Sequence, residues 1–370
     1  MHRSKNPPAS AVGSVNAAFL FDENVEYRLP DVVVDFQILE LHDVLTTVPW
    51  HIADSNIRNH WDKTGGGRGV RVAVLDTGVQ GPSLHPETSH AVKEVLSTVG
   101  DSGYDRGRSS HGQHVAGLIA GKAVGGSPNA EIISIKVLRD NGSGDDTTVT
   151  RGIYAAINAK ADIINMSLGA PAASRQMYAA LVAAMEAGII CVAATGNDNR
   201  DRLLYPAAFT DVCLAVGAVD RNLRRAAFSN YGRTPQVDLV DYGVQVVSSV
   251  IGNGYQRFSG TSMATPVASS KIANYISYAK AHNAWSGDIR EKYYKLEQVC
   301  KDLHTPGRDN LTGWGIISPD KAFSSRLWEN RPGGPTTPET PGSETTLAKI
   351  VRTADGQVRV VGDRGVLELL

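Results

Sequence analysis

Short apolar runs that alternate with helical segments constrain this chain more than any other feature. Five runs are rich in β-branched residues, are bounded by Gly, Asp or Asn, and have the length of a buried strand. They span residues 70–75, 131–137, 162–166, 188–194 and 213–219. Between them, residues 147–160 and 173–187 carry apolar side chains three to four positions apart, as a helix with one buried face does. The alternation predicts an α/β fold with three layers, in which helices cover both faces of a mostly parallel central sheet.

The 370 residues divide into four regions by composition. Residues 1–48 mix polar and Pro-containing sequence with a β-like stretch, and we interpret them as an N-terminal extension or a short pro-segment. Residues 49–328 hold the alternating pattern and form the main domain. Residues 329–346 are rich in Pro, Thr and Gly, which predicts a linker. Residues 347–370 alternate about an Asp-Gly turn signal, which predicts a β-hairpin tail that needs a surface or a partner to dock on.

Charge and hydropathy exclude several classes of function. Lys and Arg number 37 against 38 for Asp and Glu, so the formal net charge of −1 attracts no nucleic acid. The apolar runs are far shorter than the ~20 residues of a membrane-spanning helix, so no membrane insertion is expected. No secretory signal is readable after MHRSKNPPAS, and the three cysteines lack metal-type spacing. Both features favour a cytoplasmic protein with free thiols, although export without a signal peptide would leave no mark in the sequence.

Two polar residues stand at junctions where α/β proteins bind ligands. Asp76 directly follows the run 70–75, which places its carboxylate at the carboxyl end of a parallel strand. An Asp at such a place is more often a loop cap than a catalytic group. His111 begins a glycine-containing helical segment and can face a cleft. The alternatives are a hydrogen-bonded structural histidine or a metal pair with His114, but no carboxylate or thiolate cluster completes a zinc set, so we expect no metal.

Ser262 lies shortly before the helical run 267–281. Pro266 is typical of the first turn of a helix, because its missing N–H has no partner there, so we expect Ser262 at or near the helix N-terminus. Unpaired backbone N–H groups at that end can stabilise an oxyanion beside a hydroxyl nucleophile. The alternative is that Thr261 and Ser262 are plain N-caps.

These residues together supply the parts of an acyl-transfer site. A hydroxyl needs a base to become nucleophilic, and the base needs a carboxylate to fix its tautomer. Ser262, His111 and Asp76 are such a set. A fourth part, a donor for the developing oxyanion, is available from Asn197, which follows the run 188–194. The set predicts nucleophilic catalysis.

The chain resembles the subtilisin-like serine proteases in six segments, which occur in the order typical of that family. The segments are 73–78 around Asp76, 111–117 around His111, Ser167-Leu168-Gly169, Gly196-Asn197, 260–266 around Ser262, and Thr312-Gly313-Trp314-Gly315. The order Asp, His, Ser separates this family from other proteases and hydrolases with the same triad. The resemblance covers about residues 50 to 325.

The resemblance implies that residues 49–328 are a subtilisin-like endopeptidase domain that acts through an acyl-enzyme intermediate. It implies Ser262 as nucleophile, His111 as base, Asp76 as its orienting carboxylate and Asn197 in the oxyanion site. It also implies that an extended protein or peptide substrate pairs with two backbone segments above a P1 pocket. The implied substrate-binding residues are Gly142, Ser143, Gly144, Ser167, Leu168, Gly169 and Leu204.

The chain departs from the family pattern at three places. Gln113 stands where the family usually has Thr, which removes no catalytic group. Residues 122–127 contain no carboxylate, so the usual calcium-binding loop is expected to be absent; we expect no cofactor, with calcium restricted to an unassigned structural site. The segment from Asn197 to Tyr205-Pro206 is short, so the floor of the P1 pocket is expected to be rebuilt, with Leu204 where the family often has Gly.

Several alternatives stay open. A transpeptidase or macrocyclase would use the same acyl-enzyme, and a pseudoprotease would keep the groove without turnover. Asp145, Asp146 and Asp198 near the groove suggest a mild preference for basic side chains, with solvated loop charge as the alternative. For residues 1–48 we hypothesise an inhibitory or positioning segment, as in intracellular members of the family.

Overall fold

The computed structural model describes residues 21–22, 24–35, 39, 48–106, 110–232, 236–285, 288–325, 349–352, 358–362 and 365–368. A nine-stranded sheet lies at its centre, in the order β13-β14-β10-β9-β8-β7-β3-β5-β4. Its strands are β3 (Arg71–Asp76), β4 (Val92–Ser97), β5 (Glu131–Lys136), β7 (Ile163–Met166), β8 (Ile190–Ala194), β9 (Leu214–Val219), β10 (Leu239–Tyr242), β13 (Cys300–Lys301) and β14 (Ile316–Ile317). All neighbours run parallel except β13 and β14.

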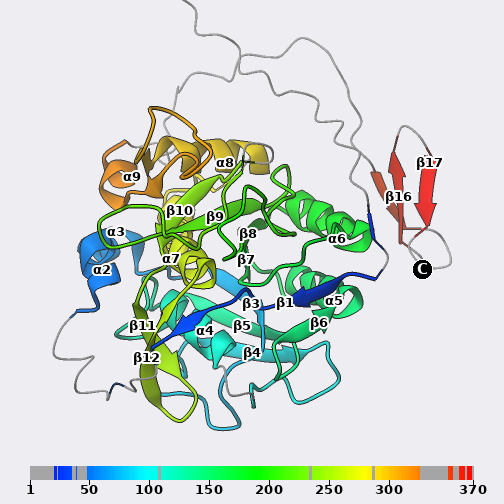
Figure 1. Ribbon diagram of the computed structural model, residues 1–370, viewed down its shortest axis with the longest axis horizontal. Coiled ribbons are helices and arrows are strands. Elements are labelled where there is room, and N and C mark those ends of the chain that lie inside the picture. Colours follow the sequence, from blue (N-terminus) through cyan, green and yellow to red (C-terminus); the bar gives the residue numbers. More distant parts are fainter. Residues whose placement is uncertain are drawn as a thin grey trace, which may run out of the picture.

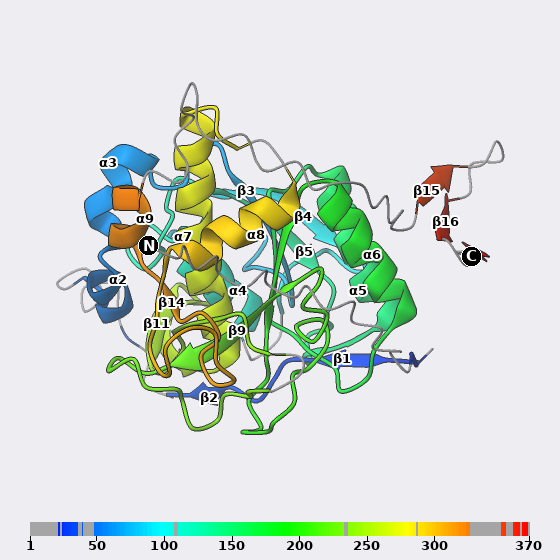
Figure 2. The same ribbon diagram turned by 90° about the horizontal axis from the view of Figure 1, so that it is seen from above.

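Helices lie on both faces of this sheet, as Figures 1 and 2 show. The longer ones are α4 (His111–Ala120), α5 (Asp146–Asn158), α6 (Arg175–Glu186), α7 (Thr261–Ala281) and α8 (Ile289–Gln298). Shorter ones are α2 (Trp50–Ser55), η1 (Ile57–His60), α3 (Trp61–Thr64) and α9 (Pro319–Ser325). The three-layer α/β architecture expected from the sequence is confirmed.

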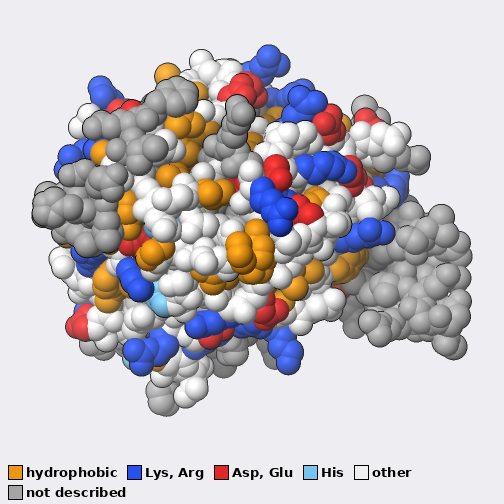
Figure 3. Space-filling view, turned by 90° about the horizontal axis from the view of Figure 1, so that it is seen from below, with side chains coloured by type: hydrophobic (Ala, Val, Ile, Leu, Met, Phe, Trp, Pro, Cys, Tyr) orange, Lys and Arg blue, Asp and Glu red, His pale blue; other side chains and the backbone are white. Residues whose placement is uncertain are grey.

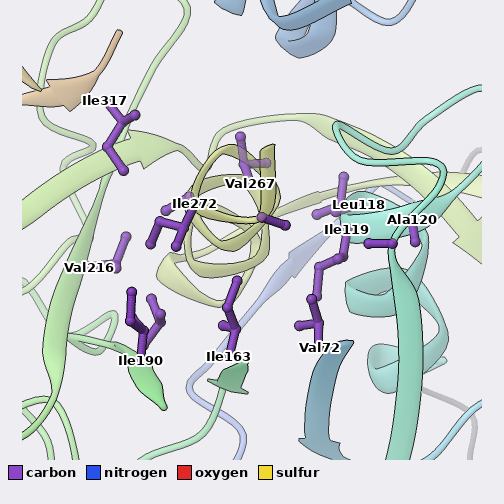
Figure 4. Packing of buried hydrophobic residues seen from close by; sticks show 14 of the residues in the cluster. Val72, Leu118, Ile119, Ala120, Ile163, Ile190, Val216, Val267, Ile272 and Ile317 are labelled. Atoms are coloured by element: carbon purple, nitrogen blue, oxygen red, sulfur yellow. The ribbon is translucent and has the colours of Figure 1, made fainter. Parts of the chain in front are cut away.

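Side chains on successive strand positions divide between two cores, because neighbouring residues of a strand point to opposite faces. Val72 belongs to the cluster around α4 and α7, and Ala73 to the cluster around α5 and α6. Figure 4 shows Ile163, Ile190 and Val216 of three neighbouring strands on one side of α7, and Val72 of β3 next to Ile119 of α4. Packing in these two cores fixes the positions of the strand ends, and therefore the positions at which the following loops begin.

Two smaller sheets lie against the domain and involve the N-terminal segment. Strand β1 (Glu26–Arg28) pairs antiparallel with β6 (Ser143–Asp145). Strand β2 (Val33–Val34) pairs with β12 (Gly254–Ser259), which in turn pairs with β11 (Val246–Val250). Residues 24–35 are thus bound along the domain at two places. They lie inside the region that the sequence assigned to an extension.

The C-terminal residues that are described form a separate antiparallel sheet of β15 (Lys349–Arg352), β16 (Val358–Gly362) and β17 (Gly365–Glu368). The sequence predicted two strands here, and the structure adds a third. The predicted linker, 329–346, lies outside the described residues.

Two helix starts differ from the sequence expectation. Helix α5 is capped by Asp145, which accepts from Thr148 N, and begins at Asp146, one residue before the predicted helical run 147–160. Helix α7 begins at Thr261, so Pro266 lies inside the helix and Ser262 is its second residue. Ser262 is therefore in the first turn, as expected.

On the face shown in Figure 3, the described Lys and Arg side chains are interspersed with Asp and Glu, and they form no large patch of one charge sign. Among the described residues, the helices are too short or too polar to cross a membrane.

Candidate active site

Asp76 and His111 form the centre of the site. Asp76 is the last residue of β3, and both of its carboxylate oxygens lie 2.9 Å from Nδ1 of His111. Asp76 is fully buried and His111 is 2% exposed. The carboxylate also accepts a hydrogen bond from the backbone N–H of Thr77 at 2.7 Å. A buried carboxylate in this position fixes the imidazole with its proton on Nδ1 and leaves Nε2 as the basic nitrogen.

Helix α4 can begin close to Asp76 because its second residue is glycine. A Cβ on Gly112 would lie 2.2 Å from the carbonyl oxygen of Gly78, so a larger residue would push the helix away from the loop that follows β3. Thr77 holds the same junction, since its Oγ1 accepts from Gly112 N at 3.1 Å and donates to Asp105 at 2.7 Å. This packing brings His111 to the end of β3.

Ser262 is fully buried in the first turn of α7 and is bound to the segment that follows β7. Its Oγ donates to the carbonyl oxygen of Ser167 at 3.3 Å, and the Ser167 hydroxyl donates to the carbonyl oxygen of Ser262 at 2.9 Å. Strands β7 and β3 are hydrogen-bonded neighbours. Ser167 and Asp76 therefore emerge at the same edge of the sheet, where α4 and α7 both begin.

Asn197 is oriented by Thr261, the residue before Ser262. Its Oδ1 accepts from both the N–H and the Oγ1 of Thr261, each at 2.8 Å. Its Nδ2 is thereby turned into the groove, where it donates to the carbonyl oxygen of Asp31 at 2.6 Å. Gly196 has a φ of +106°, which a residue with a side chain rarely adopts, so glycine is required in the turn that presents Asn197. The predicted oxyanion donor thus already holds a backbone carbonyl oxygen.

The N-terminal segment occupies the groove that the sequence assigned to substrate. Strand β1 runs between β6 and Gly169, and Tyr27 lies opposite Gly144 while Arg28 lies opposite Ser143. Arg28 exchanges two backbone hydrogen bonds with Gly169, of 3.0 and 2.9 Å, and Leu29 N donates to the carbonyl oxygen of Gly142 at 3.2 Å. Backbone pairing on both sides is the β-augmentation mode by which extended peptides bind. Gly142, Ser143, Gly144 and Gly169 therefore flank the segment on its two sides, and Leu168 is buried.

The segment loses this regular pairing at Pro30. Arg28 pairs with Gly169, so continued antiparallel pairing would bring the N–H of residue 30 to the carbonyl oxygen of Ser167. Pro30 has no N–H, and that oxygen accepts from Ser262 instead. The carbonyl oxygen bound by Asn197 belongs to Asp31, one residue further along. Beyond it, Val33 and Val34 pair with Ser259 and Phe258 of β12.

Leu204 narrows the pocket below the segment. A Cβ on either Gly169 or Gly196 would lie 2.9 Å from the Leu204 side chain, so the leucine lies against both glycines. A cavity of about 520 Å³ remains between the segment and the body of the domain. Arg200 and Arg202 line it together with Asp198.

Gln113 has a structural role in α4. It is fully buried, its Oε1 accepts from Gln80 N at 3.0 Å, and its Nε2 donates to Thr88 and to Ser249. Every polar atom of its amide is therefore used. Its neighbour His114 stacks on Phe258 and donates from Nε2 to the carbonyl oxygen of Gln256. Burial lowers the pKa of His114 to about 3, so its imidazole is neutral.

Protein groups hold the loop at residues 122–127. Both carboxylate oxygens of Glu87 accept from Ala123 N at 2.9 Å. Arg58 donates to the carbonyl oxygen of Ala123, and His51 to that of Val124. Within the described ranges, no three His, Cys, Asp or Glu side chains gather closely enough to hold a metal ion.

Sequence reasoning missed the residues that the extension adds to the site, namely Tyr27, Pro30 and Asp31. Their position depends on strand pairing with residues more than a hundred positions away. The alternation of apolar Val25 and Tyr27 with charged Glu26 and Arg28 was the signal available in the sequence, since it indicates a half-buried strand.

Comparison with known proteins adds independent findings. The sequence profile of the subtilase family matches residues 67–315. The chain is 38% identical over 285 residues to a thermostable alkaline protease of Halalkalibacterium halodurans, covering 75% of this chain and 73% of that protein. It is 35% identical over 283 residues to subtilisin Savinase of Lederbergia lenta, covering 75% and 98%. It is 32% identical over 297 residues to an intracellular serine protease of Paenibacillus polymyxa, covering 77% and 89%.

Proposed function

The chain belongs to the subtilase family and is a serine endopeptidase, and we propose that Ser262, His111 and Asp76 carry out its acyl transfer. The observation that carries the proposal is the buried contact of both Asp76 oxygens with Nδ1 of His111. Ser262 lies in the first turn of α7, which begins at the sheet edge where β3 ends with Asp76. An extended protein or peptide chain, bound as the N-terminal segment is bound, is the substrate.

The reaction proceeds in two halves. Ser262 Oγ attacks the carbonyl carbon of the scissile bond while Nε2 of His111 takes the hydroxyl proton. The tetrahedral intermediate places its oxyanion against Nδ2 of Asn197 and the N–H of Ser262. Its collapse expels the amine, which receives the proton from His111, and leaves an ester on Ser262. Water then attacks the ester and gives a proton to His111, and as the second tetrahedral intermediate collapses His111 returns that proton to Ser262 Oγ, so that the acid and free Ser262 are released.

Asp76 contributes through His111. It accepts the hydrogen bond from the Nδ1–H throughout, holds the ring in one orientation, and stabilises the imidazolium that exists between the two proton transfers. The hydrogen bond from Thr77 N to the same carboxylate supports this orientation. The role requires Asp76 to stay ionised.

We propose that residues 24–35 inhibit the enzyme by occupying its groove. A substrate residue at the place of Pro30 would donate its N–H to Ser167 and present its carbonyl group to Ser262 and Asn197. Pro30 cannot donate, and the carbonyl oxygen at Asn197 comes from Asp31. The segment therefore binds as a substrate does but out of register for cleavage.

We propose that the enzyme needs no metal ion at the 122–127 loop. Calcium would be held there by oxygen ligands. The carbonyl oxygens of Ala123 and Val124 instead accept from Arg58 and His51, and Glu87 takes the Ala123 N–H. Protein side chains therefore already bind the backbone groups of this loop, including the carbonyl oxygens that could otherwise coordinate a cation.

We also propose that the protein acts inside the cell. The similarity to the intracellular serine protease of Paenibacillus polymyxa supports this location. Burial raises the pKa of the Cys191 thiol to about 12, so this free cysteine is inert and suits a reducing compartment. Cell fractionation of a producing strain tests the proposal, and recovery of the protein in the medium of intact cells would contradict it.

Labelling with an active-site fluorophosphonate tests the catalytic assignment. A recognition site for an unrelated protease is placed within residues 40–47, and the full chain is folded. The site is then cut so that the segment with residues 24–35 can leave the groove. We expect one adduct by intact-protein mass spectrometry on the cut wild type, and none on Ser262→Ala. The uncut protein should react more slowly because the segment covers the groove. An adduct on both cut proteins, or on neither, would refute the assignment.

Product mass in the same system identifies the acyl acceptor. Hydrolysis adds one water across the cleaved bond of a peptide substrate, whereas attack by another amine gives a ligated or cyclic product. We expect hydrolysis products.

A further inference from the structure

Leu39 binds the domain at a place outside the substrate groove. Its N–H donates to the carbonyl oxygen of Tyr255 in β12 at 2.7 Å, and its carbonyl oxygen accepts from Tyr255 N at 3.1 Å. Leu39 is 8% exposed and packs with Ala123, Val124, Val247 and Tyr255 in an apolar cluster apart from the two main cores. We call the four domain residues of this cluster the anchor site.

The pairing of Leu39 is separate from that of β2. Val34, the last residue of β2, lies opposite Phe258. Leu39 lies opposite Tyr255, so five residues along the segment correspond to three along β12. A continuous antiparallel ladder advances by one residue on each strand, so Leu39 does not extend the β2 ladder. It makes a second contact of its own.

The anchor site is built from parts of the domain that are already held in place. Val247 and Tyr255 lie on β11 and β12, which pair with each other. Ala123 and Val124 belong to the loop before β5, whose carbonyl oxygens accept from protein side chains. The Tyr255 hydroxyl lies 3.5 Å from a carboxylate oxygen of Glu87, which also accepts from Ala123 N. A preorganised site loses little freedom when a ligand binds to it.

Leu39 is buried where a neighbouring aliphatic residue of the segment is not. Val33 pairs with β12 through its backbone but is 59% exposed. Full burial of a leucine side chain is equivalent to about ten-fold or more in affinity. Leu39 therefore supplies a hydrophobic contribution to binding that Val33 does not.

We propose that Leu39 anchors the inhibitory segment, residues 24–35, by occupying the anchor site. In Figure 1 the N-terminal segment runs from β6 on one side of the domain to β12 on the other, and Leu39 holds it beyond the end of the groove. A peptide that pairs with β6 and Gly169 competes with the groove contacts but leaves this anchor in place. The ligand that the site takes is an extended chain with a branched aliphatic side chain. The inference rests on the proposed function, because it assumes that residues 24–35 inhibit.

Amidated peptides that end at residue 39 test the anchor. They are titrated against the Ser262→Ala chain, which has been cut within residues 40–47 and freed of its own segment by gel filtration. The peptide of residues 22–39 should bind about ten-fold more tightly than its Leu39→Ala form, which has the same length and a similar cost of ordering. Val33→Ala is the matched control, since loss of an exposed side chain should change the affinity about two-fold at most. Equal affinities of the parent and Leu39→Ala peptides would overturn the proposal.

A change in the domain locates the effect at the anchor site. Val247→Asp places a charge among apolar groups and should weaken binding of the 22–39 peptide about ten-fold. The peptide of residues 22–35 lacks Leu39, so it should bind this variant and the parent chain alike. Val247→Ala adds no charge and should give a smaller loss, again for the longer peptide alone. A loss of equal size for both peptides with both variants would contradict the anchor.

The uncut active chain gives a readout without added peptide. Leu39→Ala should raise the rate of fluorophosphonate labelling of the uncut protein about ten-fold, because the small fraction of molecules with an open groove rises by that factor. Val33→Ala should change the rate about two-fold at most. An unchanged rate in Leu39→Ala would count against the proposal.

The anchor and the inhibition fail in different ways. If residues 24–35 do not inhibit, cutting the chain and removing the segment will leave the rate of Ser262 labelling unchanged, while peptide binding to the inactive chain still reports on the anchor. If cutting speeds labelling but Leu39→Ala alters neither peptide affinity nor the labelling rate, the inhibition stands and the anchor is refuted.

Discussion

The hydroxyl of Ser167 takes over the hydrogen bond that Pro266 cannot make to the carbonyl oxygen of Ser262. In a regular helix the N–H of residue 266 would donate to that oxygen, and proline has none. Ser167 Oγ lies 2.9 Å from the oxygen and donates to it. The first turn of α7 is thereby tied to the end of β7 at the residue that carries the nucleophile.

Removing this donor should destabilise the fold. Ser167→Ala leaves the Ser262 carbonyl oxygen buried and unpaired, which costs about 1–3 kcal/mol. Denaturant unfolding in a Ser262→Ala background, which prevents self-cleavage, measures the loss. In a Pro266→Ala background the helix regains its own donor, so the cost of Ser167→Ala should shrink. An equal loss of stability from Ser167→Ala in both backgrounds would show that the Ser167 hydroxyl does not replace the missing Pro266 donor.

Replacing Pro30 should turn the inhibitory segment into a substrate. Pro30→Ala supplies the N–H that can pair with Ser167 and moves the carbonyl group of residue 30 toward Ser262. We expect cleavage after residue 30, detected by the mass of the purified chain. Pro30→Ala combined with Ser262→Ala should stay intact. An intact Pro30→Ala single variant would contradict the register argument.

Thr261 is expected to act as a positioning residue for Asn197. Thr261→Val removes the hydroxyl that donates to Asn197 Oδ1 and retains the shape of the side chain. We expect kcat to fall about five- to ten-fold while KM changes little, because the amide contacts the oxyanion only after attack. Thr261→Ser keeps the hydroxyl and should retain nearly wild-type kcat. A loss seen equally in Thr261→Ser would indicate a packing role.

Buried histidines should make the fold sensitive to acid. Burial lowers the pKa of His114 to about 3 and that of His51 to about 4, from about 6.5 in the unfolded chain. Below pH ~6.5 the unfolded chain binds protons that the folded chain excludes, so the stability present above this pH is lost as pH falls. Each histidine contributes a slope of about 1.4 kcal/mol per pH unit between pH ~6 and the folded-state pKa.

His114→Gln isolates one of these slopes. Buried acids such as Glu87, whose pKa is raised by burial, change stability in the opposite direction over the same range, so only a difference between variants is informative. The free energy of unfolding is measured for the inactive Ser262→Ala chain, with and without His114→Gln, between pH ~4 and pH ~7. The two profiles should diverge by about 1.4 kcal/mol per pH unit. Parallel profiles would mean that His114 can be protonated in the folded protein.

Chelation should leave the enzyme unchanged. Because Glu87, Arg58 and His51 hold the 122–127 loop, treatment with EDTA should alter neither the melting temperature nor the activity of the cut protein. Glu87→Gln serves as the comparison, since weakening the protein contact should lower the melting temperature where chelation does not. A drop with EDTA that calcium reverses would reveal a structural cation site.

Five of the nine strands of the central sheet were predicted, because an apolar run rich in β-branched residues marks each of them, whereas β4, β10, β13 and β14 were missed. Residues 131–137 became β5 (Glu131–Lys136) and residues 188–194 became β8 (Ile190–Ala194), with errors of one or two residues at the ends. The contact between Asp76 and His111 was expected from the combination of Asp76, His111 and Ser262 and from the resemblance of their short motifs to the subtilisin-like proteases. Local pattern is enough where one residue type and its immediate neighbours decide the structure.

Choices between neighbouring residues and long-range pairings were not predictable in this way. Asp145, Asp146 and Thr147 can each cap a helix, and the strand preceding α5 selects Asp145. The start of α7 depends on the Ser167 hydroxyl, which lies 95 residues away in sequence. The occupation of the groove depends on pairing between Tyr27 and Gly144, which no local pattern encodes.

In the proposed inhibition, residues 24–35 and the groove that they occupy belong to one covalent chain. A tethered ligand acts at an effective concentration set by the length of its linker, in the millimolar range for short flexible linkers, whatever the concentration of the protein. Dilution therefore leaves the intact enzyme blocked. Once the chain is cut between the segment and α2 (Trp50–Ser55), inhibition becomes bimolecular and weakens as the protein is diluted.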